Sequence, residues 1–389
     1  MTRSSRKYSS KKFLRTFRRI FPDRFLKKQI RNQSLDKNAR KTFFVAFITF
    51  LLLVIILRPS STALRNLETK SNQRYLQDMS RIVPVTHSSI GERLRKISPG
   101  AMDSLLDRAQ RYFKKQCHWK GEFFPRTKVF DTTTFSVPAK QFEWAAKNGN
   151  RKAARFVFVI DQRSGAIERI IDAHETTSDN TVFEAVVKET RPGTHWVFDR
   201  GYNRLATLKL IVEKRGRFIT RWRKNTGWKF ERKRKIPTNH CREDGLEIVT
   251  DEAGIMGADP GRGQLEVRRI TCCHPGHKNP LIIITNDFKS RAMRITRIYL
   301  SRFYIEVFFR HVKTNLRTIH FPSHSPIGVH NWLVLVALSV MFILIMTHRP
   351  DREQQESILS PVFPFIERCR LVEITIMNEA WELRVAAIP

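Results

Sequence analysis

The sequence predicts an α/β fold that follows a smaller, basic and all-helical N-terminal region. From Lys128 onward, strand-like runs rich in Val, Ile, Phe and Thr alternate with helical segments at 178–189 and 203–215. A long amphipathic helix is expected at 298–316, where apolar residues recur at helical spacing. The N-terminal region is rich in cations, and a phenylalanine repeated every four positions predicts a basic amphipathic helix there. These phenylalanines are Phe13, Phe17, Phe21 and Phe25.

The chain has a large excess of positive charge. Its 389 residues include 71 Lys and Arg against 36 Asp and Glu, which gives a net charge of +35. Such an excess favours a polyanionic partner, and nucleic acid is the usual one. Ribosomal proteins share this charge but seldom this length or so many large apolar residues. Five cysteines, an odd number without framework spacing, indicate a reducing compartment.

Two uncharged apolar runs, 43–57 and 332–346, allow two interpretations. Each run could be a membrane segment, and the first could be a secretory signal. However, both are shorter than the ~20 residues that span a bilayer. A signal peptide also carries a much shorter basic region than residues 1–41. We therefore expect two buried helices and no membrane partner.

A region of short helices is expected between the first apolar run and the strands. After a break at 58–61, one helix is predicted from about Ala63 and another from His87, with Ser88 or Ser89 as its N-cap. The cation-rich pattern is typical of a helix-turn-helix-like DNA-binding unit, and equally of a plain helical subdomain.

Three carboxylates are the candidate catalytic residues. Asp131 and Asp199 each lie in an apolar, strand-like run, where a carboxylate is disfavoured and a cation partner is expected. Glu306 lies in a polar stripe of the predicted helix at 298–316, and an ion-paired surface helix is the ordinary explanation of such a stripe. Its other members are Tyr299, Arg302, Arg310 and Lys313. Together the three carboxylates form an oxygen-only set suited to Mg²⁺ or Mn²⁺, and such sets support two-metal phosphoryl transfer.

The spacing Tyr-x2-Arg-x3-Glu-x6-Lys in this helix resembles the signature of the insertion-sequence DDE transposases of the IS-four type. Residues 130–133 (Phe-Asp-Thr-Thr) resemble the first aspartate motif of that family, and residues 198–202 (Phe-Asp-Arg-Gly-Tyr) resemble the second. Residues 284–286 (Ile-Thr-Asn) resemble the strand before the glutamate helix, and the resemblance extends over about 64–346. One departure is Thr132, where many relatives have Gly or Ala.

The resemblance implies a ribonuclease-H-like (retroviral-integrase-like) catalytic core. In that fold strands 1, 2 and 3 are antiparallel, a helix follows, and strand 4 lies beside strand 1. Asp131 and Asp199 then become neighbours and, with Glu306, are the implied catalytic residues and ligands of two Mg²⁺ ions, for which Mn²⁺ can substitute. The resemblance further implies that Tyr299, Arg302 and Lys313 hold DNA.

The implied activity is cut-and-paste DNA transposition. Its partners would be double-stranded DNA with the terminal inverted repeats of the element, the target DNA, and a second copy of the chain in a homodimeric synaptic complex. Excision through a hairpin and a place in the bacterial cytoplasm with the nucleoid are also implied. Two alternatives stay open: a catalytically inactive DNA-binding remnant, and a basic membrane-associated protein.

About 224–279 is surplus to such a core and is predicted to be a β-rich insertion with a loop from Gly254 to Gly263. Its start combines basic and aromatic side chains, a mixture suited to distorted or single-stranded DNA. These candidate DNA-binding residues are Arg221, Trp222, Arg223, Lys224 and Trp228. A zinc site from 240–241 and 272–277 is disfavoured, because the spacing is not paired and Cys272 and Cys273 would point to opposite sides of a strand.

The predicted organisation has four parts. Residues 1–60 form a basic segment with an apolar helix, and 61–125 form the helical, helix-turn-helix-like region. Residues 126–347 form the catalytic domain with its insertion, and 348–389 form a tail.

Overall fold

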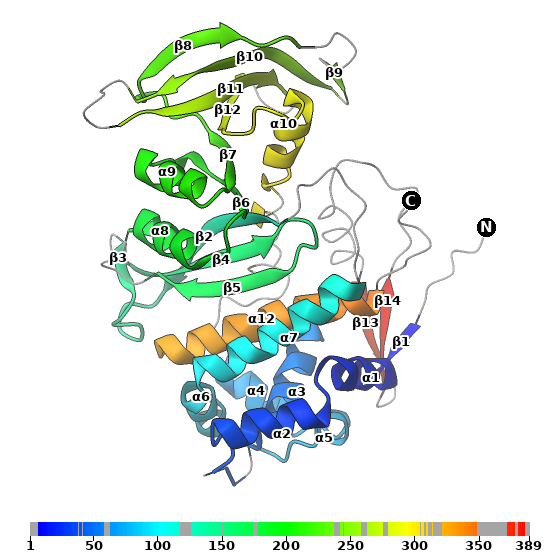
Figure 1. The fold of residues 1–389 in the computed structure, drawn as a ribbon. Coiled ribbons are helices and arrows are strands. Elements are labelled where there is room, and N and C mark those ends of the chain that lie inside the picture. The colour runs from blue at the N-terminus through cyan, green and yellow to red at the C-terminus, as the bar shows by residue number, and fades with distance from the viewer. Residues whose placement is uncertain are drawn as a thin grey trace, which may run out of the picture.

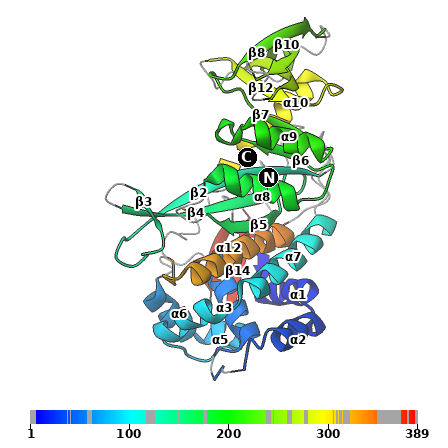
Figure 2. The ribbon, with the colours of Figure 1, turned by 60° about the vertical axis from the view of Figure 1, so that its left-hand side comes forward.

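The computed structural model describes residues 7–37, 39–40, 42–57, 63–116, 126–148, 151–173, 178–236, 242–243, 245–257, 263–274, 279–303, 305–306, 309, 313, 321–347, 372–377 and 380–385. A layer of helices lies below a large twisted sheet, and the far end of that sheet extends upward as a separate lobe (Figure 1). Figure 2 shows the same order of layers from another side. The prediction of a mixed α/β fold is confirmed.

The helical layer combines the N-terminal helices with one helix from much later in the chain. Its members are α1 (Ser10–Ile20), α2 (Asp23–Asn32), α3 (Phe44–Ile56), α4 (Leu64–Ser71), α5 (Arg74–Ser80), α6 (His87–Lys96), α7 (Pro99–Gln116) and α12 (Pro326–Thr347). α7 and α12 contact each other and strand β5 (Ile167–Asp172), so they join this layer to the sheet. A small sheet of β1 (Lys7–Ser9), β14 (Ala380–Val385) and β13 (Val372–Met377) lies at its side.

The predicted basic N-terminal helix is two helices. The chain breaks at Phe21 and Pro22 because proline has no backbone N–H for an internal helical bond and is tolerated only at a helix start. The phenylalanine spacing nevertheless has the expected effect, since Phe13 and Phe21 are fully buried and their rings lie 5.4 and 6.1 Å from the ring of Phe342 on α12.

Both apolar runs are buried helices, as predicted. Every residue of α3 except Val45 is buried, and α12 begins at Pro326, well before the apolar run that predicted it. Of the described helices, α12 is long and apolar enough to cross a membrane, but 94% of its most apolar window is buried inside the protein. The helix extends beyond the run because polar residues at its start have partners: Asn331 donates to the carbonyls of Leu94 and Ile97 at 2.8 Å.

The N-cap prediction for α6 is wrong by two or three residues. Thr86 is the N-cap, and its hydroxyl accepts a hydrogen bond from the backbone N–H of Ser89. An N-cap residue lies just before the first turn and accepts a hydrogen bond from an N–H inside that turn. The predicted caps Ser88 and Ser89 are both already inside the helix, which begins at His87. The helix predicted from residue 178 is α8 (Asp179–Glu189), and its N-cap Ser178 accepts a hydrogen bond from the N–H of Thr181.

The sheet contains the strand order that was expected. Its first part is β2 (Thr127–Val137), β4 (Arg151–Asp161), β5 and β6 (His195–Phe198), followed by β7 (Arg217–Arg221), with the short β3 (Ala146–Asn148) beside β4. β2 pairs antiparallel with β4 and β4 with β5, whereas β2, β6 and β7 are parallel neighbours. The parallel connections run through α8 and α9 (Leu205–Glu213).

The predicted insertion is β-rich and continues the same sheet. It contributes β8 (Trp228–Lys233), β9 (Arg242–Glu243), β10 (Leu246–Met256) and β11 (Leu265–Cys273), and β12 (Leu281–Thr285) returns antiparallel to β7. The predicted loop at 254–263 is wrong at its start, because β10 runs to Met256. Gly254 lies inside this strand. Glycine is required there because a Cβ would stand 2.4 Å from the carbonyl oxygen of Lys229 on β8.

The predicted continuous helix at 298–316 is also wrong. α10 (Ala292–Leu300) ends before a turn at Ser301 and Arg302, and helical geometry resumes at Phe303. The N–H of Arg302 bonds to the carbonyl of Tyr299, three residues back, instead of to that of Ile298. The Ile298 carbonyl accepts instead from the side chains of Gln162 and Ser301, so the helical ladder is interrupted there.

Candidate active site

Two aspartates lie side by side where the parallel pairing of β2 and β6 ends. β2 and β6 pair with Phe130 opposite Phe198, so Asp131 and Asp199 each follow the last paired residue. Asp199 ends its strand and precedes the 3-10 turn η1 (Arg200–Tyr202). Both side chains are half-buried. The sequence predicts a carboxylate on each strand, and the parallel register makes them neighbours.

Arg302 links the first aspartate to the glutamate. Its Nη1 lies 3.2 Å from Asp131 Oδ2, and its Nη2 lies 2.8 Å from Glu306 Oε1. Burial disfavours the charge on this guanidinium, but Tyr299, the two aspartates and Glu306 outweigh burial and raise the pKa of Arg302. A fixed positive charge therefore lies between Asp131 and Glu306.

Asp131 is in a strongly perturbing environment. Burial raises its pKa to about 6, and the charges of Glu306 and Asp199 add to that increase. Arg302 and the backbone N–H of Thr132, which donates to Asp131 Oδ1 at 2.9 Å, act in the opposite direction. The three predicted carboxylates thus share one electrostatic environment. A buried, charge-coupled carboxylate of this kind is characteristic of a functional site.

Tyr299 and Lys313 both approach this site from the segment after β12. Tyr299 is 4% exposed, burial raises its pKa to about 12, and Arg302 lies 5.9 Å from its ring centre. Lys313 Nζ donates to the carbonyl of Thr134 on β2 at 2.7 Å and lies 4.9 Å from the ring of Phe135. Tyr299 therefore lies against Arg302, and Lys313 is held against β2. Arg310, predicted on the same stripe, lies outside the described residues.

Thr132 and Tyr202 join the two aspartate motifs. The Tyr202 hydroxyl donates to Thr132 Oγ1 at 2.6 Å, and Tyr202 is 6% exposed. The threonine that departs from the usual family residue is thus the partner of a tyrosine three positions after Asp199. The sequence alone did not indicate this role for Tyr202. A signal was present, because Tyr202 lies in the second aspartate motif and a buried tyrosine hydroxyl usually makes a hydrogen bond.

The candidate residues near the insertion form a separate cluster. Trp222 and Trp228 meet edge to face with their ring centres 5.8 Å apart, and Arg269 lies 4.4 Å from the ring centre of Trp228. Both indoles are half-buried, and Lys224 is exposed. Arg221 is half-buried, and its positive charge acts to lower the pKa of the buried Tyr299.

The three candidate carboxylates do not surround a common point in this arrangement. Within the described part of the chain, no three His, Cys, Asp or Glu side chains stand close enough together to enclose a metal ion. The physical reason is Arg302, whose guanidinium occupies the place between Asp131 and Glu306. The donor chemistry still fits a hard divalent ion, since the groups are carboxylates. Glu306, whose side chain is 43% exposed, would need to leave Arg302 to join the aspartates.

The thiols at the end of β11 differ in exposure. Cys272 is buried, Cys273 is half-buried, and both are free. Burial raises the pKa of Cys272 to about 11, which disfavours the thiolate that zinc binds. Residues 240, 241 and 277 lie outside the described residues.

Comparisons with known proteins agree with this chemistry. The family model of the transposase DDE domain matches residues 122–342. A Sinorhizobium fredii (strain NBRC 101917 / NGR234) protein named as a transposase, y4zB, is 28% identical over 223 residues, which are 56% of this chain and 59% of that protein. A Geobacillus stearothermophilus protein named as the transposase for insertion sequence element IS5377 is 21% identical over 282 residues, 72% of each chain. A cryo-EM structure of the piggyBac transposase synaptic complex with hairpin DNA matches with a TM-score of 0.44 and 10% identity, covering 94% of this chain and 82% of that one.

Two aspartates on adjacent parallel strands, with a third carboxylate within electrostatic reach, are the kind of set that two-metal phosphoryl-transfer sites use. More particularly, this chain belongs to the transposase DDE domain family, whose model covers more than half of its length. The predicted resemblance to insertion-sequence transposases is therefore confirmed. The chain spans 59% of the length of the Sinorhizobium relative.

Proposed function

We propose that this protein is a transposase that cuts double-stranded DNA at the terminal inverted repeats of its own insertion sequence and joins the ends to target DNA. The observation that carries the proposal is the parallel register of β2 and β6, which makes Asp131 and Asp199 neighbours within the electrostatic reach of Glu306. The net charge of +35 supports DNA as the partner.

The proposal includes a ribonuclease-H-like core at 126–347, and the order β5-β4-β2-β6-β7 supports it. Residues 61–125 would form the DNA-binding helical region, preceded by the basic segment 1–60 and followed by the tail 348–389. A homodimer in the synaptic complex and a nucleoid-associated place in the bacterial cytoplasm belong to the same proposal. Both come from the resemblance to insertion-sequence transposases.

Asp131, Asp199 and Glu306 would hold divalent ions, with Mg²⁺ the proposed ion and Mn²⁺ a substitute. Bound ions supply the polarisation of the scissile phosphate and the activation of the attacking oxygen. The remaining contribution of the protein is to position the DNA. Arg302, if Glu306 were released from it, would present N–H groups in a fork that matches a phosphate. Lys313 would approach the same DNA along β2.

The test uses three charge-removing variants, Asp131→Asn, Asp199→Asn and Glu306→Gln. Each should abolish metal-dependent cleavage of a duplex that carries the end of the element, while DNA binding changes little. Each should also lose the increase in melting temperature that Mg²⁺ causes in the wild type. Glu213→Gln, an exposed change on α9, is the matched control and should behave like the wild type.

The outcomes separate the alternatives. A variant that cleaves at a rate near the wild type shows that its residue is wrongly assigned. A wild-type protein that binds DNA but cleaves with neither Mg²⁺ nor Mn²⁺ is an inactive remnant. An affinity for DNA that does not fall between low and physiological salt contradicts nucleic acid as the partner.

A further inference from the structure

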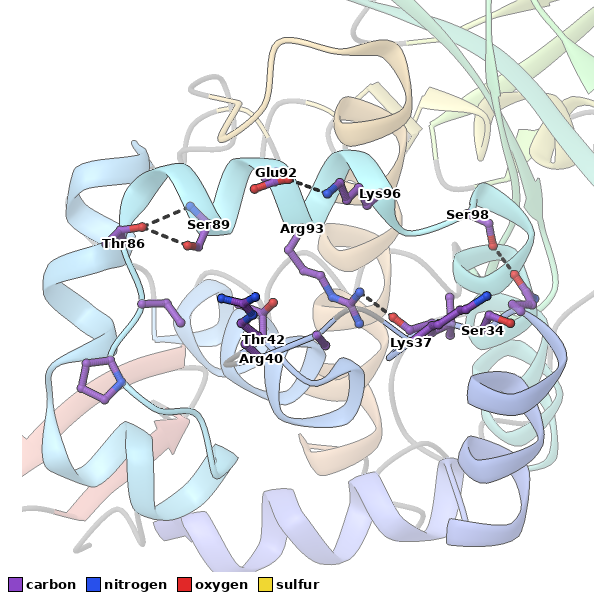
Figure 3. A pocket seen from close by; sticks show the side chains of 15 residues that line it. Ser34, Lys37, Arg40, Thr42, Thr86, Ser89, Glu92, Arg93, Lys96 and Ser98 are labelled. Carbon is purple, nitrogen blue, oxygen red and sulfur yellow. Dashed lines mark hydrogen bonds and ion pairs between the residues drawn. The ribbon is translucent and has the colours of Figure 1, made fainter.

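A cavity of about 650 Å³ opens in the helical layer, and it belongs to none of the carboxylates described above (Figure 3). Three stretches line it: the segment after α2, the segment before α6, and α6 itself. Its size lies within the range of roughly 300–1,000 Å³ that is typical of ligand sites. The labelled side chains in Figure 3 come from all three stretches and are mostly polar or basic.

The base of the cavity is held by a buried arginine. The Arg93 side chain is 10% exposed, and its guanidinium donates to the carbonyl of Leu35 at 2.6 Å and to Asp36 Oδ1 at 2.8 Å. Its Nε is buried without a hydrogen-bond partner. That atom is closed off by the protein, so Arg93 shapes the wall of the cavity, and Asp36 offsets its charge.

The charges at the cavity do not cancel. Arg93 is paired with Asp36, and Lys96 is paired with Glu92 at 2.5 Å. Lys37 and Arg40 also line the cavity and are exposed, and within the described part of the chain neither has an ion-pair partner. Two positive charges are therefore left for an anion.

The N-terminal end of α6 adds neutral donors. Thr86 and Ser89 line the cavity, and their hydroxyl groups lie 3.0 Å apart. The positive end of a ten-residue helix favours an anion beside them. No aromatic side chain occurs among the described residues that line the cavity, so a nucleotide base would find no ring on which to stack.

We propose that this cavity binds a phosphate group of the DNA backbone at a distance from the cleaved bond. The inference rests on the proposed transposase function, because it takes DNA as the partner. The unpaired Lys37 and Arg40 would neutralise the phosphate, and the hydroxyls and the N-terminal end of α6 would donate to it. Contacts of this kind set the register of a protein on a duplex without reading its sequence.

The test compares two double variants of the full chain. Lys37→Ala/Arg40→Ala removes the two unpaired cations. Lys27→Ala/Lys28→Ala removes the same charge from exposed positions on α2 that do not line the cavity. Binding of a fluorescent duplex that carries the end of the element is measured over a range of salt concentrations.

The cavity variant should bind more weakly by on the order of 10-fold, and the slope of log affinity against log salt should fall by about 1, because one neutralised phosphate is lost. The control should change the affinity much less. Inorganic pyrophosphate and ATP are titrated into the wild type in parallel, and we expect only weak binding of either.

Two results would overturn the inference. Equal losses in both variants would mean that the layer is a general basic surface. Tight binding of pyrophosphate or ATP that the cavity variant loses, with DNA binding unchanged, would assign the cavity to a free phosphorylated ligand. Metal-dependent cleavage by the wild type is measured separately, so a failure of the cavity proposal can be told from a failure of the proposed function.

Discussion

The side-chain amide of Gln162 donates a hydrogen bond to the carbonyl oxygen of Ile298 across 2.8 Å. Gln162 follows β4 and is 2% exposed, and it also donates to the Ser301 hydroxyl. The bond occupies the carbonyl that a continuous helix would have offered to the N–H of Arg302. α10 therefore ends beside the active site, and the turn that follows carries Arg302 to Asp131 and Glu306.

Gln162→Glu tests this positioning role, because glutamate keeps the size of the side chain but cannot donate when ionised. We expect a loss of about 1–3 kcal/mol of stability and a cleavage rate lower by roughly 10- to 100-fold as Arg302 moves. Unfolding in denaturant and cleavage per folded molecule measure the two effects.

Gln110→Glu is the matched control. Gln110 is also buried and donates to two carbonyls, those of Ile167 and Glu168, away from Arg302. It should lose similar stability and keep its cleavage rate. A similar fall in cleavage rate for both variants would make Gln162 a structural residue only.

Arg302→Ala and Lys313→Ala should impair the hairpin and joining steps more than the first nick. Both cations only donate, so their work is to hold phosphates, which matters most when DNA is bent sharply. Arg302→Lys should not restore the rate, because one ammonium cannot bridge Asp131 and Glu306 as a fork does. Intact and pre-nicked ends are compared for nicked, hairpin and joined products. Arg291→Ala, an exposed cation before α10, serves as control, and an equal loss there would contradict a specific role.

His330 predicts a pH dependence of stability. Its Nε2 lies 3.1 Å from Asp103 on α7 and its Nδ1 3.7 Å from Asp172 on β5. Burial alone would lower its pKa, but the two carboxylates outweigh burial and raise it to about 9. Because the folded-state pKa is above the unfolded one, the stabilisation is complete below the ordinary histidine value and is lost as pH rises through about 9.

Unfolding of the wild type and His330→Gln should therefore differ by roughly 1–3 kcal/mol at mildly acidic pH and much less above pH 9. His87→Gln, which breaks a solvent-exposed pair with Glu68, should show little difference at either pH. A difference for His330→Gln that does not change with pH would mean that packing, and not the charge, holds the helix.

Arg268 should be the most costly charged residue to remove from the insertion. It is 2% exposed, pairs with Asp251 at 2.6 Å, and donates to the carbonyls of Asp287 and Ser290 in the segment before α10. Arg268→Ala leaves Asp251 buried with only the more distant Arg234 as a cationic neighbour. The variant should lose about 3–5 kcal/mol of folding stability. Arg232→Ala breaks an exposed pair with Glu266 and should cost less than about 1 kcal/mol by denaturant unfolding. Equal costs would contradict burial as the cause.

Local pattern was enough to predict the kinds of elements and the class of chemistry. Ser178 caps α8 because capping depends on residues within one turn. The two aspartates could be assigned to strands because a carboxylate in an apolar run is visible in the sequence. The family motifs then supplied the strand order that brings them together, and the sheet has that order. Motif spacing likewise indicated a DDE transposase, which the family match confirms.

Only the tertiary structure decided how the site is held. The break after α10 depends on Gln162, the bridge from Arg302 to Asp131 spans two distant segments, and the cavity beside α6 is built from three. None of these leaves a local trace, because the energy of each comes from a partner far away in the chain. The helical pattern of 298–316 is continuous in the sequence, and the helix is nevertheless interrupted where Gln162 and Ser301 donate to the Ile298 carbonyl.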